Sequence, residues 1–305
     1  MMSDFIKVLD HLHFTLKKVS VVKVLKPFII ENYYDIENTV IFPINSRLRY
    51  GKYTKKVKKE SFLFIPANKV VSLAFGKGRS VRLSYDDFLE EKEKYVTKDN
   101  FLRRNPIDQK YLVLNFETKV LNSINIFHSK NLKPLVIERN AQTLSILKDI
   151  VKERYYRYPG SEKLIDLQSQ RLSIEIIRYI LSNQPLFSSI EENFKYFKDE
   201  RILDLFQYVS DNIDKELSNK KLADFLNISE EYVGQYFKNN TGYSPQDYIE
   251  LRRMEEAIKM LRSDDESIKV IGMKVGFKDT AYFCRRFKLM FGVQAGMMRK
   301  RFNEI

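Results

Sequence analysis

The chain has 305 residues, of which 44% are hydrophobic and 30% charged, so it can hold two domains with cores of their own and does not have a disordered composition. Its single cysteine, Cys284, excludes a disulfide framework and a thiolate metal cluster. No apolar run approaches the roughly 20 residues of a membrane span, and the N-terminus has no secretory hydrophobic segment. We therefore expect a cytoplasmic protein with no membrane partner.

The net charge of +13 indicates a polyanionic partner, but its distribution complicates that interpretation. Residues 199–305 contain 18 basic and 18 acidic residues, so the whole excess lies in residues 1–198. The densest basic run lies within residues 47–59 and fits a solvated hairpin, an auxiliary DNA contact or a site for an anionic effector. The net charge would place a nucleic-acid site in residues 1–198, whereas the motifs described below lie in residues 199–305. Local sequence patterns therefore have to locate the nucleic-acid site.

Strand patterns dominate the first half of the chain. Short runs of β-branched and aromatic residues are separated by turn residues such as Gly51, Gly76 and Gly78. The predicted strands are Val19–Leu25, Thr39–Ile44, Ser46–Thr54, Val57–Pro66, Val70–Phe75, Val81–Tyr85 and Tyr111–Thr118. Since no long helix is predicted between them, they indicate a barrel or a sandwich of the jelly-roll type.

Helical periodicity replaces the strand pattern after Pro134. Apolar residues recur at helical spacing over Asn140–Tyr156 and over Ser161–Ser182, where Asn183-Gln184-Pro185 ends the second helix. The segment Phe187–Lys198 is typical of a linker, and everything after Arg201 is predicted to be helical. The predicted domains are residues 1–190 and 199–305, joined by a linker at 191–198.

An internal repeat lies in the last part of the chain. Residues 232–249 (YVGQYFKNNTGYSPQDYI) align with residues 282–299 (YFCRRFKLMFGVQAGMMR) at an offset of fifty. Phe237 matches Phe287, Lys238 matches Lys288, and upstream LADFLNIS (residues 222–229) pairs with IGMKVGFK (residues 271–278). Two copies of one supersecondary unit are therefore expected.

Each copy of the repeat predicts a helix-turn-helix unit. A short helix (Leu222–Asn227 or Ile268–Val275) ends at a tight turn, where Gly276 is free to adopt a left-handed conformation in the second copy. Ser229 and Asp279 are suitable N-caps for the second helix. That helix has a narrow apolar stripe and otherwise polar or basic faces, as a recognition helix in a DNA major groove requires.

A long helix is predicted between the two copies. Ser244 caps it, Pro245 suits its first position, and it runs to about Leu261. At ~1.5 Å per residue this connector measures roughly 25 Å, which suits two recognition helices about one DNA turn, roughly 34 Å, apart. One monomer would then read two successive major grooves.

The order of these elements resembles the AraC/XylS family of transcription regulators. The resemblance rests on a G-x-S-P-x-x-Y element (residues 242–248) and on G-F-x-D-x-x-Y-F-x-R-x-F-K (residues 276–288), and it covers residues 199–305. It departs from the family pattern at Gln294-Ala295 and Met298, where a Ser/Thr-Pro and a Tyr are usual, so a slightly altered last helix is expected.

The resemblance implies base contacts near Glu231, Gly234 and Gln235 in the first unit and at Thr280, Ala281, Tyr282 and Arg285 in the second. Adjacent basic residues complete the predicted interface. Its ten DNA-binding residues are Glu231, Gln235, Lys238, Lys278, Thr280, Ala281, Tyr282, Arg285, Arg286 and Lys288. Residues 199–266 carry a net charge of −7 and residues 267–305 a net charge of +7, so the second unit is expected to contribute more to phosphate binding.

The first half of the chain resembles the cupin-like domain of the same family through ESFLFIPAN, residues 60–68. The implied fold is α+β, with an N-terminal cupin-like β-barrel followed by dimerisation helices and a C-terminal all-α domain with two helix-turn-helix units. The implied partners are double-stranded promoter DNA, RNA polymerase, a small-molecule effector and a second copy of the chain.

No metal site, cofactor or catalytic residue is predicted. His11 and His13 have the spacing of a cupin metal pair, but they precede the predicted barrel, and the only other histidine is His128. Cys284 fits a small residue near the phosphates better than a redox switch. The sequence shows neither a nucleophile–base pair nor a phosphate-binding glycine loop.

Three functional hypotheses follow from these patterns. The first is a DNA-binding transcription regulator, most simply an activator, that is controlled by an effector or by dimerisation. The second is a cupin-type receptor or enzyme in which DNA binding is secondary, and it requires a catalytic or metal-binding set in residues 1–130. The third is a regulator without an effector, whose N-terminal half only dimerises.

Overall fold

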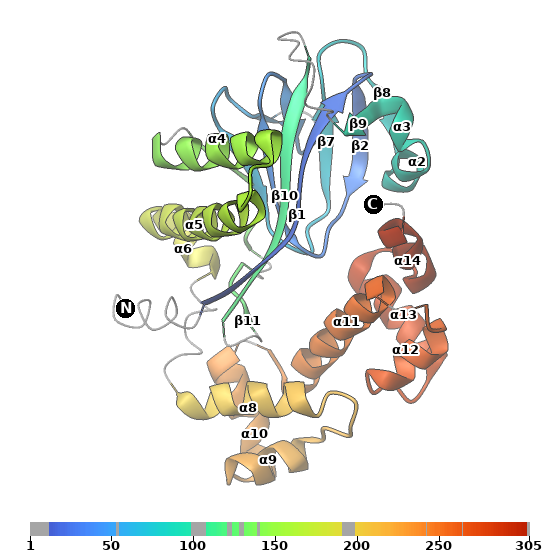
Figure 1. The fold of residues 1–305 in the computed structure, drawn as a ribbon. Helices are drawn as coiled ribbons and strands as arrows, with labels where there is room; N and C mark the ends of the chain where they lie inside the picture. The colour runs from blue at the N-terminus through green and yellow to red at the C-terminus, as the bar shows by residue number, and fades with distance from the viewer. Residues whose placement is uncertain are drawn as a thin grey trace. The chain divides into compact units, whose positions relative to one another are not determined.

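Figure 1 shows the computed structural model of the chain, which describes residues 12–52, 55–98, 108–120, 124–127, 131–138, 141–190, 199–241, 243–263 and 265–303. The chain divides into two compact units, one formed by Leu12–Ile190 and the other containing Glu191–Ile305. The predicted linker, residues 191–198, lies outside the described residues. Among the described residues, no helix has the length and apolarity needed to cross a membrane.

The N-terminal unit is built mainly of strands. They are β1 (Leu12–Val24), β2 (Phe28–Tyr33), β3 (Asn38–Pro43), β4 (Leu48–Tyr50), β5 (Lys55–Lys56), β6 (Phe62–Ile65), β7 (Val71–Phe75), β8 (Val81–Leu83), β9 (Val96–Lys98), β10 (Lys110–Val120), β11 (Ile124–Asn125) and β12 (Leu135–Ile137). One sheet has the order β12-β6-β3-β10-β1-β9, with β11 paired to β10, and the other has the order β5-β4-β7-β2-β8. The long antiparallel pair of β1 and β10 forms the centre of the first sheet.

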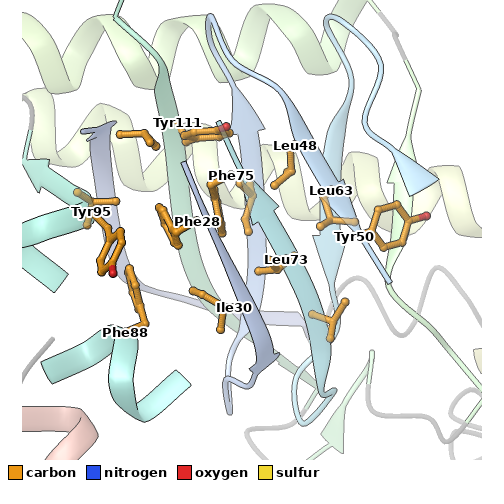
Figure 2. Close-up of a cluster of buried hydrophobic side chains, with 14 of the residues drawn as sticks. Phe28, Ile30, Leu48, Tyr50, Leu63, Leu73, Phe75, Phe88, Tyr95 and Tyr111 are labelled. Atoms are coloured by element: carbon orange, nitrogen blue, oxygen red, sulfur yellow. The ribbon is translucent and has the colours of Figure 1, made fainter. Parts of the chain in front are cut away.

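An apolar core fills the space between the two sheets, as Figure 2 shows. Phe28 lies at its centre, with its ring 4.9 Å from that of Phe75 and 5.0 Å from that of Phe88. Leu63 of the first sheet and Leu73 of the second are both completely buried in the same cluster. The unit is therefore a sandwich of two open sheets rather than a single closed barrel.

Helices cover other parts of the N-terminal unit (Figure 1). Helices α2 (Tyr85–Glu90) and α3 (Lys92–Tyr95) follow β8, and α4 (Ala141–Tyr156), α5 (Ser161–Ser182) and α6 (Gln184–Ile190) follow the strands. Helices α4 and α5 pack on one another and on β1. Ser84 begins α2 with a capping box in which its Oγ accepts from the Asp87 amide.

The structure confirms the α+β fold class and most of the predicted elements, and it corrects several details. The strands β2, β5, β9, β11 and β12 and the short helices α2 and α3 were not predicted, and β12 lies after Pro134, where helical periodicity was expected. Residues 84–85, expected at the end of a strand, instead begin α2. The segment 187–190, expected in the linker, belongs to α6. The predicted helix Ser161–Ser182 is confirmed to the residue.

The C-terminal unit is entirely helical over its described residues. It contains α8 (Glu200–Asp211), α9 (Asn219–Leu226), α10 (Glu230–Thr241), α11 (Pro245–Ser263), α12 (Ile268–Lys274), α13 (Thr280–Phe291) and α14 (Ala295–Asn303). Despite Gln294-Ala295, α14 forms as a regular helix, and Ala295 and Met298 are buried in it.

Candidate nucleic-acid interface

The two predicted helix-turn-helix units are α9–α10 and α12–α13. Each turn needs one residue with a left-handed backbone, and this residue is Asn227 (φ 54°) in the first unit and Gly276 (φ 88°) in the second. The predicted N-caps are confirmed, because Ser229 Oγ accepts from the Tyr232 amide and the Asp279 carboxylate accepts from the Tyr282 amide. The repeat in the sequence therefore corresponds to a repeat in the backbone.

Aromatic side chains hold each second helix of a unit in place. In the first unit, Phe237 of α10 lies 6.0 Å from Phe206 and 5.4 Å from Tyr248, measured between ring centroids. In the second unit, Phe287 of α13 lies 5.7 Å from Phe283 and 4.7 Å from Phe291. Phe237, Phe283 and Phe287 are completely buried, so they form the core side of these two helices.

Helix α10 presents a mixed polar face to solvent. Glu231, Gln235 and Lys238 follow the spacing i, i+4, i+7, and all three are exposed. Gly234 lies among them with no atom within 4 Å of a built Cβ, so the helix has open space at that position. Glu230 and Glu231 place two carboxylates in the first turn, and this arrangement repels a phosphate.

Helix α13 presents a basic face at the equivalent positions. Ala281, Arg285 and Lys288 have the same spacing and are exposed, as is Tyr282. Thr280 is half-buried at the start of the helix, and Lys278 is exposed in the turn before it. The first turn of α13 contains no acidic residue, in contrast to the first turn of α10.

Arg286 differs from the other predicted contact residues. It is half-buried, and its Nε donates to Glu250 Oε1 of α11 over 2.6 Å. This hydrogen bond and ion pair raises the pKa of Arg286. The Tyr282 hydroxyl donates to the other oxygen of Glu250 over 3.4 Å. Glu250 therefore anchors the exposed face of α13 to the long helix, a link that the sequence analysis did not identify.

A second set of polar contacts fixes the start of α8 to α10. Asp199 caps α8, pairs with Arg201 at 2.8 Å and accepts from the Tyr236 hydroxyl at 2.9 Å. The hydrogen bond from Arg201 holds the pKa of Asp199 at about 2, and burial raises the pKa of Tyr236 to about 12. These contacts place Arg201 over the Tyr236 ring at 5.2 Å.

The predicted residues form two exposed faces, one on α10 and one on α13, at equivalent positions of the repeat. Gly242, a residue of the family motif, lies outside the described residues. His11 and His128 also lie outside them, so the expectation that no metal binds is not tested. Groups of three or more side chains placed to hold a metal ion do not occur in the part of the chain that the structure describes.

Comparison with known proteins identifies the domain that carries these faces. Residues 222–301 match a family described as a helix-turn-helix domain. The chain is 27% identical over 152 residues to the transcriptional activator RhaS of Enterobacter sp. (strain 638), a match that covers 50% of this chain and 52% of the relative. It is 28% identical over 152 residues to the MmsAB operon regulatory protein of Pseudomonas aeruginosa, covering 48% of each chain. The chain thus spans about half the length of the curated relatives it matches.

Two solved structures are similar to the chain at lower identity. A transcriptional regulator from Chromobacterium violaceum with an AraC-type DNA-binding domain is 22% identical, with a TM-score of 0.32 over 33% of this chain and 91% of that one. ToxT from Vibrio cholerae O395 is 11% identical, with a TM-score of 0.46 over 97% of this chain and 100% of that one.

Proposed function

We propose that the chain is a sequence-specific DNA-binding regulator of transcription of the AraC/XylS type, because residues 222–301 match a helix-turn-helix domain and relatives such as RhaS are transcriptional activators. The observation that carries the proposal is the pair of equivalent exposed faces on α10 and α13. Each face lies on the second helix of a helix-turn-helix unit, the element that enters a major groove in this class of protein.

The geometry fits one monomer on two successive major grooves. Helix α11 has 19 residues and measures roughly 28 Å at ~1.5 Å per residue. This length is close to the roughly 34 Å between major grooves on one side of the duplex. Because the two faces differ in sequence, the two half-sites on the DNA need not be palindromic.

Arg285 is the residue to which we assign direct base reading, because it is exposed and lies in the N-terminal half of α13. An arginine in this position suits a guanine, whose two major-groove acceptors match a guanidinium. We assign Lys278, Lys288 and the terminal nitrogens of Arg286 to phosphate contacts. In the first unit, Gln235 suits adenine and Glu231 suits the cytosine amino group.

Selection of bound sequences from random DNA with the full chain tests the proposal. We expect a site of two unlike half-sites about one helical turn apart. The double variant Arg285→Ala/Lys288→Ala should lose selection in one half-site. Lys259→Ala/Lys215→Ala is the matched control, because it removes the same charge from exposed positions outside both faces. Enrichment of no sequence by the wild type would refute the proposed function.

We also propose that the DNA-bound protein activates transcription in the cytoplasm by contacting RNA polymerase. The activator RhaS among the relatives supports this direction of regulation. Transcription in vitro from a promoter that carries the selected site should rise when the protein is added. Reduced transcription would make the protein a repressor and leave its DNA binding intact.

The N-terminal unit is, in this proposal, the part that responds to a small anionic effector. Lys18, Asn115 and Thr39 stand directly opposite one another on β1, β10 and β3, on the side of the sheet that faces the core. Asn115 Nδ2 donates to Thr39 Oγ1 over 3.0 Å and to Asp35 Oδ2 over 2.8 Å. This row forms a polar patch next to the apolar core.

The charge of that patch supports an anionic ligand. Burial and the nearby Lys92 and Lys98 lower the pKa of Lys18 to about 8, against the opposite effect of Asp35 and Glu37. An anion bound beside these three lysines would relieve the repulsion between them. Thermal-shift screening of the full chain against small carboxylates and phosphates should find a stabilising ligand. Its effect should disappear in Lys18→Met. A ligand that stabilises both proteins equally would place the effector site elsewhere, and a screen without any stabilising ligand would favour control by dimerisation alone.

We further propose that the chain forms a homodimer through α5. Leu164 and Leu167 on this helix are 46% and 47% exposed, and Ile174 and Leu181 continue the same stripe half-buried. Sedimentation should give a dimer for the wild type and a monomer for Leu164→Glu/Leu167→Glu. Lys77→Glu/Arg79→Glu, which adds two carboxylates at exposed positions outside this helix, is the control. A wild-type monomer at tens of micromolar would contradict this proposal.

A further inference from the structure

Three polar residues form a continuous face on the long helix α11. Gln246, Glu250 and Arg253 follow the spacing i, i+4, i+7, so they lie on one side of the helix. All three border a groove of about 910 Å³ that is also lined by residues of both helix-turn-helix units. We refer to these three residues as the polar face of α11.

The polar face of α11 is bonded to the turn between α8 and α9, which leads into the first helix-turn-helix unit. Arg253 donates from Nε to the Ile213 carbonyl over 3.0 Å and from Nη2 to the Lys215 carbonyl over 2.6 Å. Gln246 Nε2 donates to the Leu217 carbonyl over 3.0 Å, in the same turn. Backbone carbonyls in a turn have no partner in a helix or strand ladder, and two side chains of α11 supply donors to them here.

The same face is bonded to the second unit. The Arg253 guanidinium lies 5.9 Å from the ring centroid of Phe277, in the turn between α12 and α13. Glu250 accepts from Arg286 and Tyr282 of α13, as described above. Arg253 therefore contacts, with one side chain, the turn that precedes the first unit and the turn within the second.

Gly276 shows how closely the two turns approach. A Cβ built at this glycine would lie 2.7 Å from the Ile213 carbonyl oxygen, in the turn between α8 and α9, and 2.8 Å from Arg253 Nη2. These distances are too short for any other residue, and the φ of 88° is also strained for one with a side chain. Gly276 thus lets the turn of the second unit pack closely against Arg253 and against the turn that precedes the first unit.

We propose that the polar face of α11 sets the distance and rotation between α10 and α13, so that the protein selects the number of base pairs between its two half-sites. Arg253 is the central positioning residue of this device. The inference rests on the proposed function, since it concerns how the two DNA-reading faces are held. One base pair changes the separation of the half-sites by about 3.4 Å and their rotation by about 34°, so a rigid pair of units cannot follow it.

Binding to a series of DNA sites tests the proposal. The series contains the selected site, the same site with one base pair inserted or removed between the half-sites, and a site with one half-site scrambled. The spacing ratio is the affinity for the selected site divided by the affinity for the site with one inserted base pair. For the full-length wild type we expect a ratio of about ten or more, because one unit loses its base contacts.

Arg253→Ala should reduce the spacing ratio to about three or less, a difference of under about 1 kcal/mol. Its affinity for the site with one scrambled half-site should stay close to that of the wild type, because α10 and α13 keep their own faces. Lys259→Ala is the matched control, since Lys259 is an exposed cation of the same helix that pairs with Glu256 within that helix. It should leave the ratio unchanged.

The outcomes separate the two levels of the proposal. A wild type that enriches no sequence overturns the proposed function. A wild type that binds a selected site with a ratio near one overturns this inference alone, as does a folded Arg253→Ala variant that keeps the wild-type ratio. If Arg253→Ala does not fold in thermal unfolding, Gln246→Ala and Arg253→Lys decide. A wild-type ratio in both of these variants overturns the inference, and a reduced ratio in either supports it.

Discussion

Replacing Arg285 or Gln235 with alanine compares the two DNA-reading faces at equivalent positions of the repeat. Both side chains are exposed in the N-terminal half of their helices. Their surroundings differ, because α10 begins with Glu230 and Glu231 whereas α13 has no acidic residue in its first turn. Residues 199–266 carry a net charge of −7 and residues 267–305 one of +7, so phosphate attraction is concentrated in the second unit.

The expected magnitudes follow from these contacts. Loss of a bidentate contact between Arg285 and a guanine should cost about 1–3 kcal/mol, or roughly 5- to 150-fold in affinity, and should relax preference at one base pair. Gln235→Ala should cost less binding free energy, because the glutamates at the start of α10 repel the DNA phosphates and weaken the contacts of this helix. Because glutamine is uncharged, the salt dependence of the affinity should stay unchanged. Lys288→Ala should instead reduce the slope of log affinity against log salt by about 0.9, the effect of one neutralised phosphate.

The assay is binding affinity on one selected site at several salt concentrations, for the wild type and the three variants. Circular dichroism of each variant confirms that the helices are intact. Equal losses for Arg285→Ala and Gln235→Ala, or a larger loss for Gln235→Ala, would show that the charge imbalance does not rank the two units. A smaller salt slope for Arg285→Ala than for Lys288→Ala would assign Arg285 to a phosphate.

Further predictions concern stability and organisation. Phe287→Ala should cost about 3–5 kcal/mol of unfolding free energy, as for other buried phenylalanines, and a variant that melts like the wild type would contradict its core position. Tyr248→Phe should stabilise the chain by about 1–2 kcal/mol, because the buried Tyr248 hydroxyl has no hydrogen-bond partner among the described residues; a lower melting temperature would reveal a partner. Arg201 holds the folded-state pKa of Asp199 at about 2. The contribution of this ion pair to the free energy of unfolding is therefore full above about pH 4 and is lost as the pH falls toward 2. Asp199→Asn should remove this pH dependence at a cost under about 1 kcal/mol, and an unchanged acid unfolding curve would contradict it. Limited proteolysis should cut first within residues 191–198, if residues 1–190 and 199–305 fold independently, and a first cut inside α11 would contradict that boundary.

The recognition elements could be predicted from the sequence because their causes are local. Ser229 and Asp279 cap the helices that follow them, and Gly276 permits a left-handed turn wherever it occurs in a chain. The exposed positions of α10 and α13 follow from a helical period applied to two copies of one pattern. Strand β2 was missed because Phe28, Ile29 and Ile30 are all buried, so the run lacks the alternation that marks a half-buried strand.

The sequence by itself determined the two helix-turn-helix units, their exposed faces and the imbalance of charge between them, because these properties depend on residues close together in the chain. Only the tertiary structure decided that the strands form two open sheets and that Arg286 is bonded to Glu250. It also placed Arg253 between the Ile213 carbonyl and Phe277, residues 40 and 24 positions away in the chain. A periodic pattern predicts which side of a helix is polar, but the partner of that side depends on how distant segments pack.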